Sequence, residues 1–306
     1  MKIAVVGAGA MGSIFGARFA QAGHDTVLVD VAEPLVDAIN ANGLTVVRGG
    51  DETVTHVRAT TDPASVGPVD IVVFFTKCYH TAAAAEGARP LVGPTTVVAS
   101  LQNGWGNGDT LAAAFPPEQV VVGVTYNSGL VEGLGRVVHP AEQPTLVGSF
   151  VDDGDGAARL AEAIAAAGFE ATIASPVRPE IWKKLILNAA TLPAAALTAM
   201  HAGALGACED TRALVADTTR EAVLVAQALG YGIEYEERID TILALLEKAG
   251  PSKASMLQDV EAGRRTEIDV INGAVVKAAD DLGVEVPINR ALMQLIKGWE
   301  TLRGLR

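Results

Sequence analysis

The chain has 306 residues, a length that predicts about two domains. Hydrophobic residues make up 49% of it, which is enough for a buried core and excludes an intrinsically disordered protein. The 23 basic and 36 acidic residues give a net charge of −13. This charge disfavours binding to nucleic acids or to a membrane surface, because both are negatively charged.

The cysteines and the apolar stretches of the chain indicate in which cellular compartment the protein is expected. Cys78 and Cys208 are too few for a disulfide framework or a zinc site, so we expect a reduced, cytoplasmic protein, with a single bridge between the two cysteines as the alternative. Met1 and Lys2 lead directly into a strand-like run, without the pattern of a secretory signal. The most apolar stretch, 185–200, is interrupted by Asn188 and Pro193, so no transmembrane helix is predicted.

The first part of the chain alternates short apolar runs with helical patterns, and this alternation predicts a doubly wound parallel sheet of the Rossmann type. Residues 44–61 predict strands in a hairpin-like excursion, interrupted at Gly49 and Gly50. The predicted strands are Ile3–Val6, Thr26–Val29, Asp70–Phe75, Thr96–Ser100 and Val120–Val124, and the predicted helices are Ser13–Ala22, Pro34–Asn40 and Thr81–Ala88.

The pattern changes after the Asp152–Gly156 stretch. A helix at 157–167 and a last strand at 170–174 come before Ser175, Pro176 and Pro179, which mark a domain boundary. We therefore expect a dinucleotide-binding domain over 1–175 and an all-helical substrate domain over 176–306. The helices predicted in the second domain are Glu180–Leu192, Thr211–Leu229, Ile239–Lys248, Lys253–Ala262, Glu267–Leu282 and Arg290–Leu305.

A glycine motif follows the first predicted strand. It comprises Gly7, Ala8, Gly9, Ala10, Met11 and Gly12. In such a motif the first glycine permits the tight turn, the second lets a pyrophosphate approach the backbone, and the third lets the helix pack closely on the strand. An ordinary glycine-rich turn is the alternative. The strand before the motif, the helix after it and a second strand ending in an acid favour a dinucleotide-binding loop.

That acid is Asp30, at the end of the second predicted strand. A carboxylate there can accept both hydroxyls of an adenosine ribose and would repel a 2′-phosphate, so it favours NAD over NADP. Val31, Ala32 and Glu33 offer no cation for such a phosphate. The alternative is an acid at a strand end with no ligand.

Four polar residues are candidates for a reactive site. Lys77 and Asn103 follow predicted strands, at the sheet edge where ligands bind in open parallel sheets. A solvated lysine and an asparagine in an Asx turn are equally consistent with these positions. Lys184 and Asn188 are four residues apart and share one face of a predicted helix. A lysine beside apolar side chains has a lowered pKa and can donate a proton near neutral pH, whereas Lys183 points elsewhere and is expected in solvent. Without further context, two solvated surface lysines are the favoured interpretation of this helix.

Other polar residues carry less information. Spacing does not show whether Ser255 and Glu267 meet, because Gly263 separates two predicted helices. Taken alone, they suggest a helix cap and a solvated acid. The five histidines are scattered without metal-binding spacing, so no metal is expected. The chain has neither G-x-S-x-G nor a Walker motif, so hydrolase and kinase functions lack support.

Taken together, these motifs have a recognisable order, and the chain resembles the ketopantoate reductase (2-dehydropantoate 2-reductase) family over its whole length. The resemblance is carried by the glycine motif and five further blocks. These are Thr76-Lys77, Leu101-Gln102-Asn103-Gly104, Trp182-Lys183-Lys184-Leu185 with Asn188, Ser255-Met256-Leu257-Gln258-Asp259, and Thr266-Glu267-Ile268-Asp269 with Ile271-Asn272-Gly273.

The resemblance implies a Rossmann domain followed by a helical domain, with the active site in the cleft between them and ketopantoate reduced by hydride transfer from NAD(P)H. By this resemblance Lys184 is the general acid, and Glu267 engages substrate and orients Lys184. It also implies that Asn188 contacts the substrate hydroxyl and Ser255 its carboxylate. Lys77 and Asn103 then lie near nicotinamide and substrate, and a homodimer is compatible with the family.

Three differences from the family pattern leave the substrate open. Leu192 stands where the family usually has an asparagine before the proline of this helix, so the substrate pocket is expected to be more apolar. Residues 126–129 replace a Thr-His-Gly-Ala-like segment, and Asp30 favours NADH where the family favours NADPH. One alternative is therefore an NAD-dependent dehydrogenase of a different 2-hydroxy acid. A second is a cofactor-binding sensor without catalysis, against which Lys184, Asn188, Ser255 and Glu267 argue together.

Overall fold

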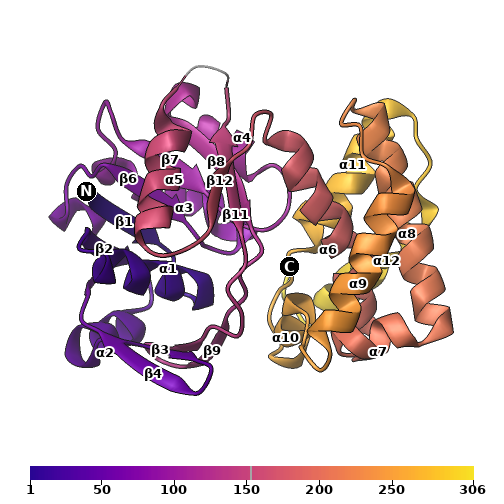
Figure 1. Ribbon diagram of the computed structural model, residues 1–306, viewed down its shortest axis with the longest axis horizontal. Helices are drawn as coiled ribbons and strands as arrows, with labels where there is room; N and C mark the ends of the chain where they lie inside the picture. The colour runs from indigo at the N-terminus through magenta and orange to yellow at the C-terminus, as the bar shows by residue number, and fades with distance from the viewer. Residues whose placement is uncertain (152–153) are drawn as a thin grey trace. The chain divides into compact units, whose positions relative to one another are not determined.

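The computed structural model describes residues 1–151 and 154–306, which divide into two units. The first comprises Met1–Gln102 and Asn107–Val177, and the second comprises Asn103–Gly106 and Arg178–Arg306. Asp152 and Asp153, where the sequence pattern was predicted to change, lie outside the described residues. Each unit has its own hydrophobic core, and Figure 1 shows their elements.

The first unit contains an eight-stranded sheet in the order β12-β11-β8-β7-β6-β1-β2-β5. Its strands pair in parallel except β8 with β11, which are antiparallel. Val, Ile and Ala fill most of the central strands, as expected for a sheet buried on both faces. The strands are β1 (Lys2–Val6), β2 (Asp25–Val29), β5 (Arg58–Thr60), β6 (Ile71–Phe74), β7 (Val97–Ser100), β8 (Val120–Thr125), β11 (Thr145–Ser149) and β12 (Ala171–Ile173).

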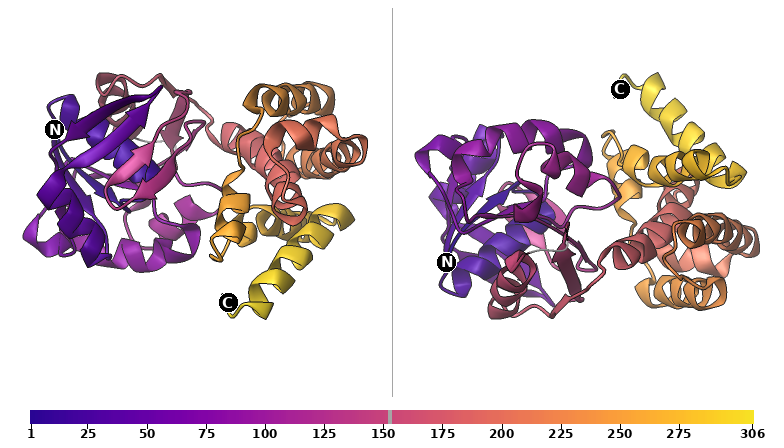
Figure 2. Two further views of the ribbon diagram at one scale, coloured as in Figure 1. Left: turned by 90° about the horizontal axis from the view of Figure 1, so that it is seen from below. Right: turned by 90° about the horizontal axis from the view of Figure 1, so that it is seen from above.

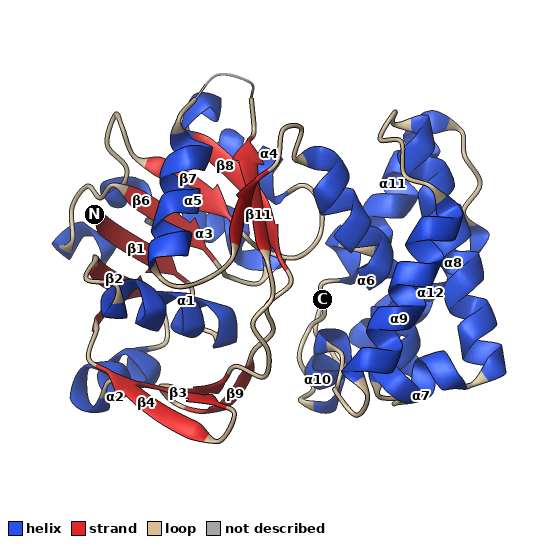
Figure 3. Ribbon diagram, in the orientation of Figure 1, coloured by secondary structure: helices blue, strands red, loops and turns tan. Residues whose placement is uncertain are grey.

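Helices cover both faces of this sheet. Helices α1 and α5 contact each other and the strands, and α3 and α4 form a second contacting pair, which Figure 3 shows behind the sheet as it is drawn. The doubly wound, mainly parallel sheet predicted from the sequence is therefore confirmed. The helices of this unit are α1 (Ala10–Gln21), α2 (Glu33–Asn42), α3 (Thr81–Gly87), α4 (Asn107–Ala112) and α5 (Gly156–Ala166).

A second, four-stranded sheet has the order β4-β3-β10-β9. The predicted hairpin is present, because β3 (Leu44–Arg48) pairs antiparallel with β4 (Asp51–Thr55) across Gly49 and Gly50. Two strands that the sequence pattern did not predict, β9 (Leu130–Gly133) and β10 (Arg136–Val138), complete it.

The second unit consists of helices and a 3-10 turn, η5 (Ile268–Val270), together with residues 103–106. Figure 2 shows α12, the yellow helix that ends at the C label, beside α11, with which it packs. Among the described residues, no helix is long and apolar enough to cross a membrane. The helices are α6 (Arg178–Thr198), α7 (Ala202–Ala207), α8 (Glu209–Ala228), α9 (Tyr235–Ala249), α10 (Ser255–Glu261), α11 (Asn272–Leu282) and α12 (Pro287–Leu302).

Two predicted helix bounds differ from the structure by more than the others do. Helix α6 was expected to end at Leu192 but continues through Pro193 to Thr198. Pro193 has no N–H to donate to the Ala189 carbonyl, and the side-chain amide of Asn272 donates to that carbonyl instead, at 2.9 Å. Glu267 was expected to begin a helix, but it precedes η5, and the following helix begins only at Asn272.

Candidate active site

The glycine motif lies between β1 and α1, and its three glycines have different surroundings. Gly7 has φ +96°, and a Cβ there would come within 2.8 Å of the Thr76 backbone nitrogen. A Cβ on Gly12 would overlap the Gly7 carbonyl oxygen. Both positions therefore need glycine for the fold itself.

Gly9 is different, because a Cβ there would have no protein atom within 4 Å, and its φ of −67° suits any residue. It is the N-cap of α1, and no side chain caps this helix end. Neither packing nor backbone conformation in the described protein therefore requires glycine at position 9. The absence of a side chain leaves room for a ligand beside a helix N-terminus whose N–H groups attract an anion.

Asp30 is positioned against this loop. Its carboxylate accepts the Ala8 N–H at 2.7 Å through Oδ2 and the Ala32 N–H at 3.0 Å through Oδ1. An ionised carboxylate has about four acceptor positions, so two stay open for further donors. Asp30 thus shapes the glycine loop and retains acceptors at the carboxyl end of β2.

Lys77 lies just beyond β6 at the same edge of the sheet, since β1, β2, β6 and β7 run parallel. Its segment is held by Gln102, a buried residue just after β7. The Gln102 amide donates to the Thr76 carbonyl at 2.7 Å and to the Thr81 hydroxyl at 2.8 Å. Gln102 was not among the predicted site residues, although it stands beside Asn103 in a block that the resemblance uses.

Asn103 belongs to the second unit, although it follows a strand of the first. The adjoining Gly104 has φ +86°, and a Cβ there would come within 2.6 Å of the Val270 carbonyl oxygen. The Trp105 N–H donates to that same carbonyl at 2.9 Å, and the Trp105 ring packs edge-on against Trp182. Asn103 is therefore held close to η5, the turn that Glu267 precedes.

Helix α6 carries Lys184 and Asn188 on one face, with Trp182, Leu185 and Ile186 buried around them. Burial lowers the pKa of Lys184 to about 8, although the negative charge of Glu267 acts to raise it. Glu267 is itself only 7% exposed. The structure thus brings together two residues that are far apart in the sequence.

The neighbouring residues are placed as follows. The Lys183 ammonium points to a different partner, Glu180, at 2.9 Å. Ser255 is the first residue of α10, and α10 packs against α6.

The predicted site residues are divided between the two units. The first unit contains the glycine motif, Asp30 and Lys77, and the second contains Asn103, Lys184, Asn188, Ser255 and Glu267. Over the part of the chain that the structure describes, no group of three or more His, Cys, Asp or Glu is placed to hold a metal ion.

Two models of one protein family match the two parts of the chain. The family model described as ketopantoate reductase PanE/ApbA matches residues 3–152, and that of its C-terminal part matches residues 176–300. The chain belongs to the ketopantoate reductase family.

Relatives and solved structures agree with this membership over the full length. The 2-dehydropantoate 2-reductase of Pyrococcus abyssi is 34% identical over 99% of both chains, and that of Halobacterium salinarum is 31% identical over 97% of this chain and 98% of its own. A PanE/ApbA family ketopantoate reductase from Ralstonia eutropha is similar in structure, with a TM-score of 0.91 and 34% identity over 99% of this chain and 100% of its own. A D-mandelate dehydrogenase, solved with NADH and anilino(oxo)acetate, has a TM-score of 0.95 at 26% identity over 100% of both chains.

Proposed function

We propose that this protein is an oxidoreductase that reduces a 2-keto acid to the 2-hydroxy acid with NAD(P)H, and that ketopantoate is its default substrate. The observation that carries the proposal is the Lys184–Glu267 pair, in which a largely desolvated lysine has a pKa of about 8. Such a lysine is still protonated at neutral pH but gives up its proton far more readily than a solvated one. The membership of the ketopantoate reductase family supports this assignment.

The second unit would act on the substrate. The Lys184 ammonium stabilises the negative charge that develops on the carbonyl oxygen and transfers a proton from Nζ to that oxygen. The Glu267 carboxylate engages substrate and orients Lys184, and its negative charge keeps the ammonium protonated. Asn188 donates to the oxygen that becomes the hydroxyl, and the Ser255 hydroxyl contacts the substrate carboxylate. We accordingly assign catalysis to residues 176–306 and dinucleotide binding to residues 1–175.

The first unit fits a nicotinamide dinucleotide. The open space at Gly9, the uncapped N-terminus of α1 and the free acceptors of Asp30 match a pyrophosphate and an adenosine ribose. Ala8, Ala10, Met11 and Gly12 would line the phosphates with Gly7 and Gly9, and Lys77 and Asn103 would lie near the nicotinamide and the substrate. When bound, the dinucleotide supplies the hydride. We propose a preference for NADH because of the charge of Asp30.

The test is the initial rate of NADH and of NADPH oxidation with ketopantoate and a panel of 2-keto acids. Lys184→Ala should abolish turnover while NADH binding persists. Lys183→Ala is the matched control, because Lys183 is the adjacent lysine and is paired with Glu180. We expect it to retain near wild-type rates. If no 2-keto acid is turned over by the wild-type protein but NADH binds, the protein is instead a cofactor-binding sensor.

A second candidate function is an NAD-dependent dehydrogenase of a more apolar 2-hydroxy acid. Leu192 favours it, since it continues the face of α6 that carries Lys184 and Asn188 and is only 8% exposed. The structural similarity to D-mandelate dehydrogenase supports it as well. Leu192→Asn should raise kcat/KM for ketopantoate and lower it for apolar keto acids if this candidate is right. A homodimer and a cytoplasmic location stay predictions. Sedimentation of the purified protein would test the homodimer.

A further inference from the structure

Glu300, on α12, is a fully buried carboxylate outside the site described above. Its Oε1 atom accepts two hydrogen bonds from one residue, Thr266. The Thr266 N–H donates at 2.8 Å and the Thr266 hydroxyl at 2.6 Å. Thr266 immediately precedes Glu267, so the buried acid is attached to the backbone beside the proposed partner of Lys184.

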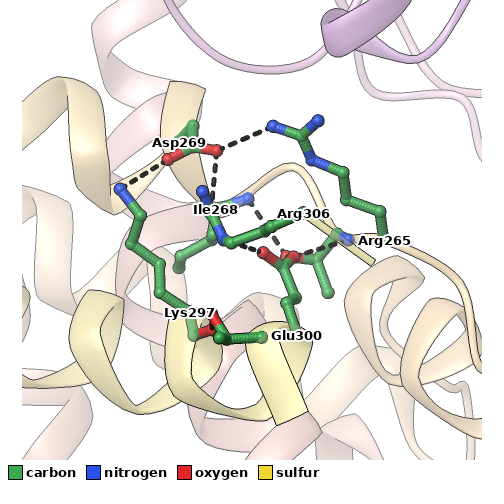
Figure 4. Close-up of polar contacts among 8 residues, drawn as sticks. Arg265, Ile268, Asp269, Lys297, Glu300 and Arg306 are labelled. Atoms are coloured by element: carbon green, nitrogen blue, oxygen red, sulfur yellow. Dashed lines mark hydrogen bonds and ion pairs between the residues drawn. The ribbon is translucent and has the colours of Figure 1, made fainter. Parts of the chain in front are cut away.

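The second oxygen of Glu300 is paired with Arg306, as Figure 4 shows. Arg306 Nε lies 2.7 Å from Glu300 Oε2, and Arg306 Nη2 lies 2.8 Å from Asp269 Oδ2. One guanidinium therefore bridges the buried acid on α12 and an acid in η5. A buried carboxylate with its charge uncompensated would be strongly unfavourable, so this pairing holds the Glu300 side chain in place.

Asp269 anchors the other side of the same turn. Its carboxylate also forms ion pairs with Lys297, whose Nζ lies 2.8 Å from Oδ1, and with Arg265, whose Nη2 lies 3.2 Å from Oδ2. Burial acts to raise the pKa of Asp269, but the hydrogen bonds from Lys297 and Arg306 outweigh it and lower the pKa. Asp269 is thus held as an anion from three directions.

These contacts constrain Glu267 from both sides. On the side before it, Thr266 is bonded to Glu300. On the side after it, the Ile268 N–H donates to the Thr266 hydroxyl at 3.2 Å, and Asp269 is held by Arg306. The backbone from 266 to 269 therefore has little freedom.

We propose that Glu300 and Arg306 are positioning residues, which act through Thr266 and Asp269 to hold the Glu267 carboxylate against Lys184. This inference rests on the proposed function for the roles of Lys184 and Glu267 in turnover. The geometric claim concerns only the protein, so it can be tested without a substrate. A cluster that merely docks α12 would make no difference to the electrostatic environment of Lys184.

The test compares Thr266→Val with Thr266→Ser and a matched control, Thr219→Val. Valine has nearly the shape of threonine but removes the hydroxyl that bonds Glu300, whereas serine restores it. Thr219 is also fully buried in the second unit, and its hydroxyl donates to the Val215 carbonyl of its own helix, at 2.7 Å. The readout is the pH dependence of Lys184 acetylation by acetic anhydride, followed by mass spectrometry, which gives the pKa of Lys184 directly.

We expect Thr266→Val to shift the Lys184 titration to lower pH, because a displaced Glu267 no longer favours the charged ammonium. Thr266→Ser and Thr219→Val should titrate like the wild type. For turnover of a 2-keto acid, Thr266→Val should lower kcat by between about tenfold and a hundredfold, the effect of misplacing a catalytic group. Thr219→Val should leave kcat unchanged.

An unchanged Lys184 titration in folded Thr266→Val would overturn the proposal. If Thr266→Val does not fold, Thr266→Ala takes its place, since it removes the same hydroxyl from Glu300 and changes no charge. The same downward shift then supports the proposal, and an unshifted titration overturns it. If the wild type reduces no keto acid, the proposed function fails, and the titration still decides whether the cluster positions Glu267.

Discussion

Ala8 and Asp30 are joined by a hydrogen bond from the Ala8 N–H to the Asp30 carboxylate, 2.7 Å long. The bond connects the second residue of the glycine motif to the end of the neighbouring strand. The same side chain that the sequence suggested as a ribose ligand therefore also shapes the glycine loop. A substitution at Asp30 has to separate these two roles.

Asp30→Asn makes that separation, because an asparagine keeps an oxygen that accepts the Ala8 N–H but loses the negative charge. We expect the ratio of kcat/KM for NADH over NADPH to fall by about tenfold, or about 1.4 kcal/mol, since a 2′-phosphate is no longer repelled. Steady-state kinetics with both cofactors measure this ratio. Asp25→Asn is the control, because Asp25 is the exposed acid at the opposite end of the same strand. An unaltered ratio in Asp30→Asn would show that Asp30 serves the loop alone.

Gly9→Ala and Gly12→Ala distinguish space kept for a ligand from space needed by the fold. A Cβ at Gly9 meets no protein atom within 4 Å, so Gly9→Ala should keep the wild-type Tm and lose at least about tenfold in NADH affinity. A Cβ at Gly12 overlaps the Gly7 carbonyl, so Gly12→Ala should lower the Tm. Thermal melts and NADH fluorescence titrations measure the two effects. Wild-type NADH affinity in Gly9→Ala would contradict binding of the dinucleotide at this loop.

Local patterns predicted most of the first unit. The strands that enter the parallel sheet are short apolar runs bounded by turn residues, and Gly49 and Gly50 marked the β3–β4 hairpin. The strands β9 and β10 were missed because β9 is exposed along its whole length and carries no alternating pattern. β11 was missed because it is defined by antiparallel pairing with β8 rather than by its local sequence.

Long-range contacts account for the failures in the second unit. A proline usually ends a helix, and nothing near Pro193 shows that Asn272 satisfies the carbonyl that the proline leaves free. The roles of Lys184 and Glu267 came from the family resemblance, since their proximity depends on the packing of separate elements. The Glu300–Arg306 pair was not predicted at all, because a lone acid and a lone arginine late in the chain look like solvated charges.

The pH dependence of turnover should report Lys184. Its pKa of about 8 means that the acid form is present below pH 8 and lost above it. We therefore expect kcat/KM for keto acid reduction to fall as the pH rises through about 8, and the reverse oxidation to rise over the same interval. Glu267→Gln should move both limbs to lower pH, because the Glu267 charge raises the pKa. A limb near the ordinary pKa of a lysine would argue against Lys184 as the proton donor.

Pro193 lies within α6, and Asn272 stands in for the donor that it lacks. Asn272 is fully buried, and its amide donates to the Ala189 carbonyl at 2.9 Å and to Asn289 Oδ1 at 3.1 Å. Asn272→Leu leaves both acceptors buried without this donor, so we expect a loss of about 3 kcal/mol in the free energy of unfolding.

The proline supplies the control for this prediction. In Pro193→Ala, the backbone N–H returns and can donate to the Ala189 carbonyl, so Asn272→Leu should cost about 1 kcal/mol less in that background. Urea unfolding of the wild type, the two single variants and the double variant measures the coupling. Additive effects would mean that Asn272 does not stand in for the donor that the proline lacks. A positive coupling would explain why a helix carrying Lys184 and Asn188 before the proline continues beyond it.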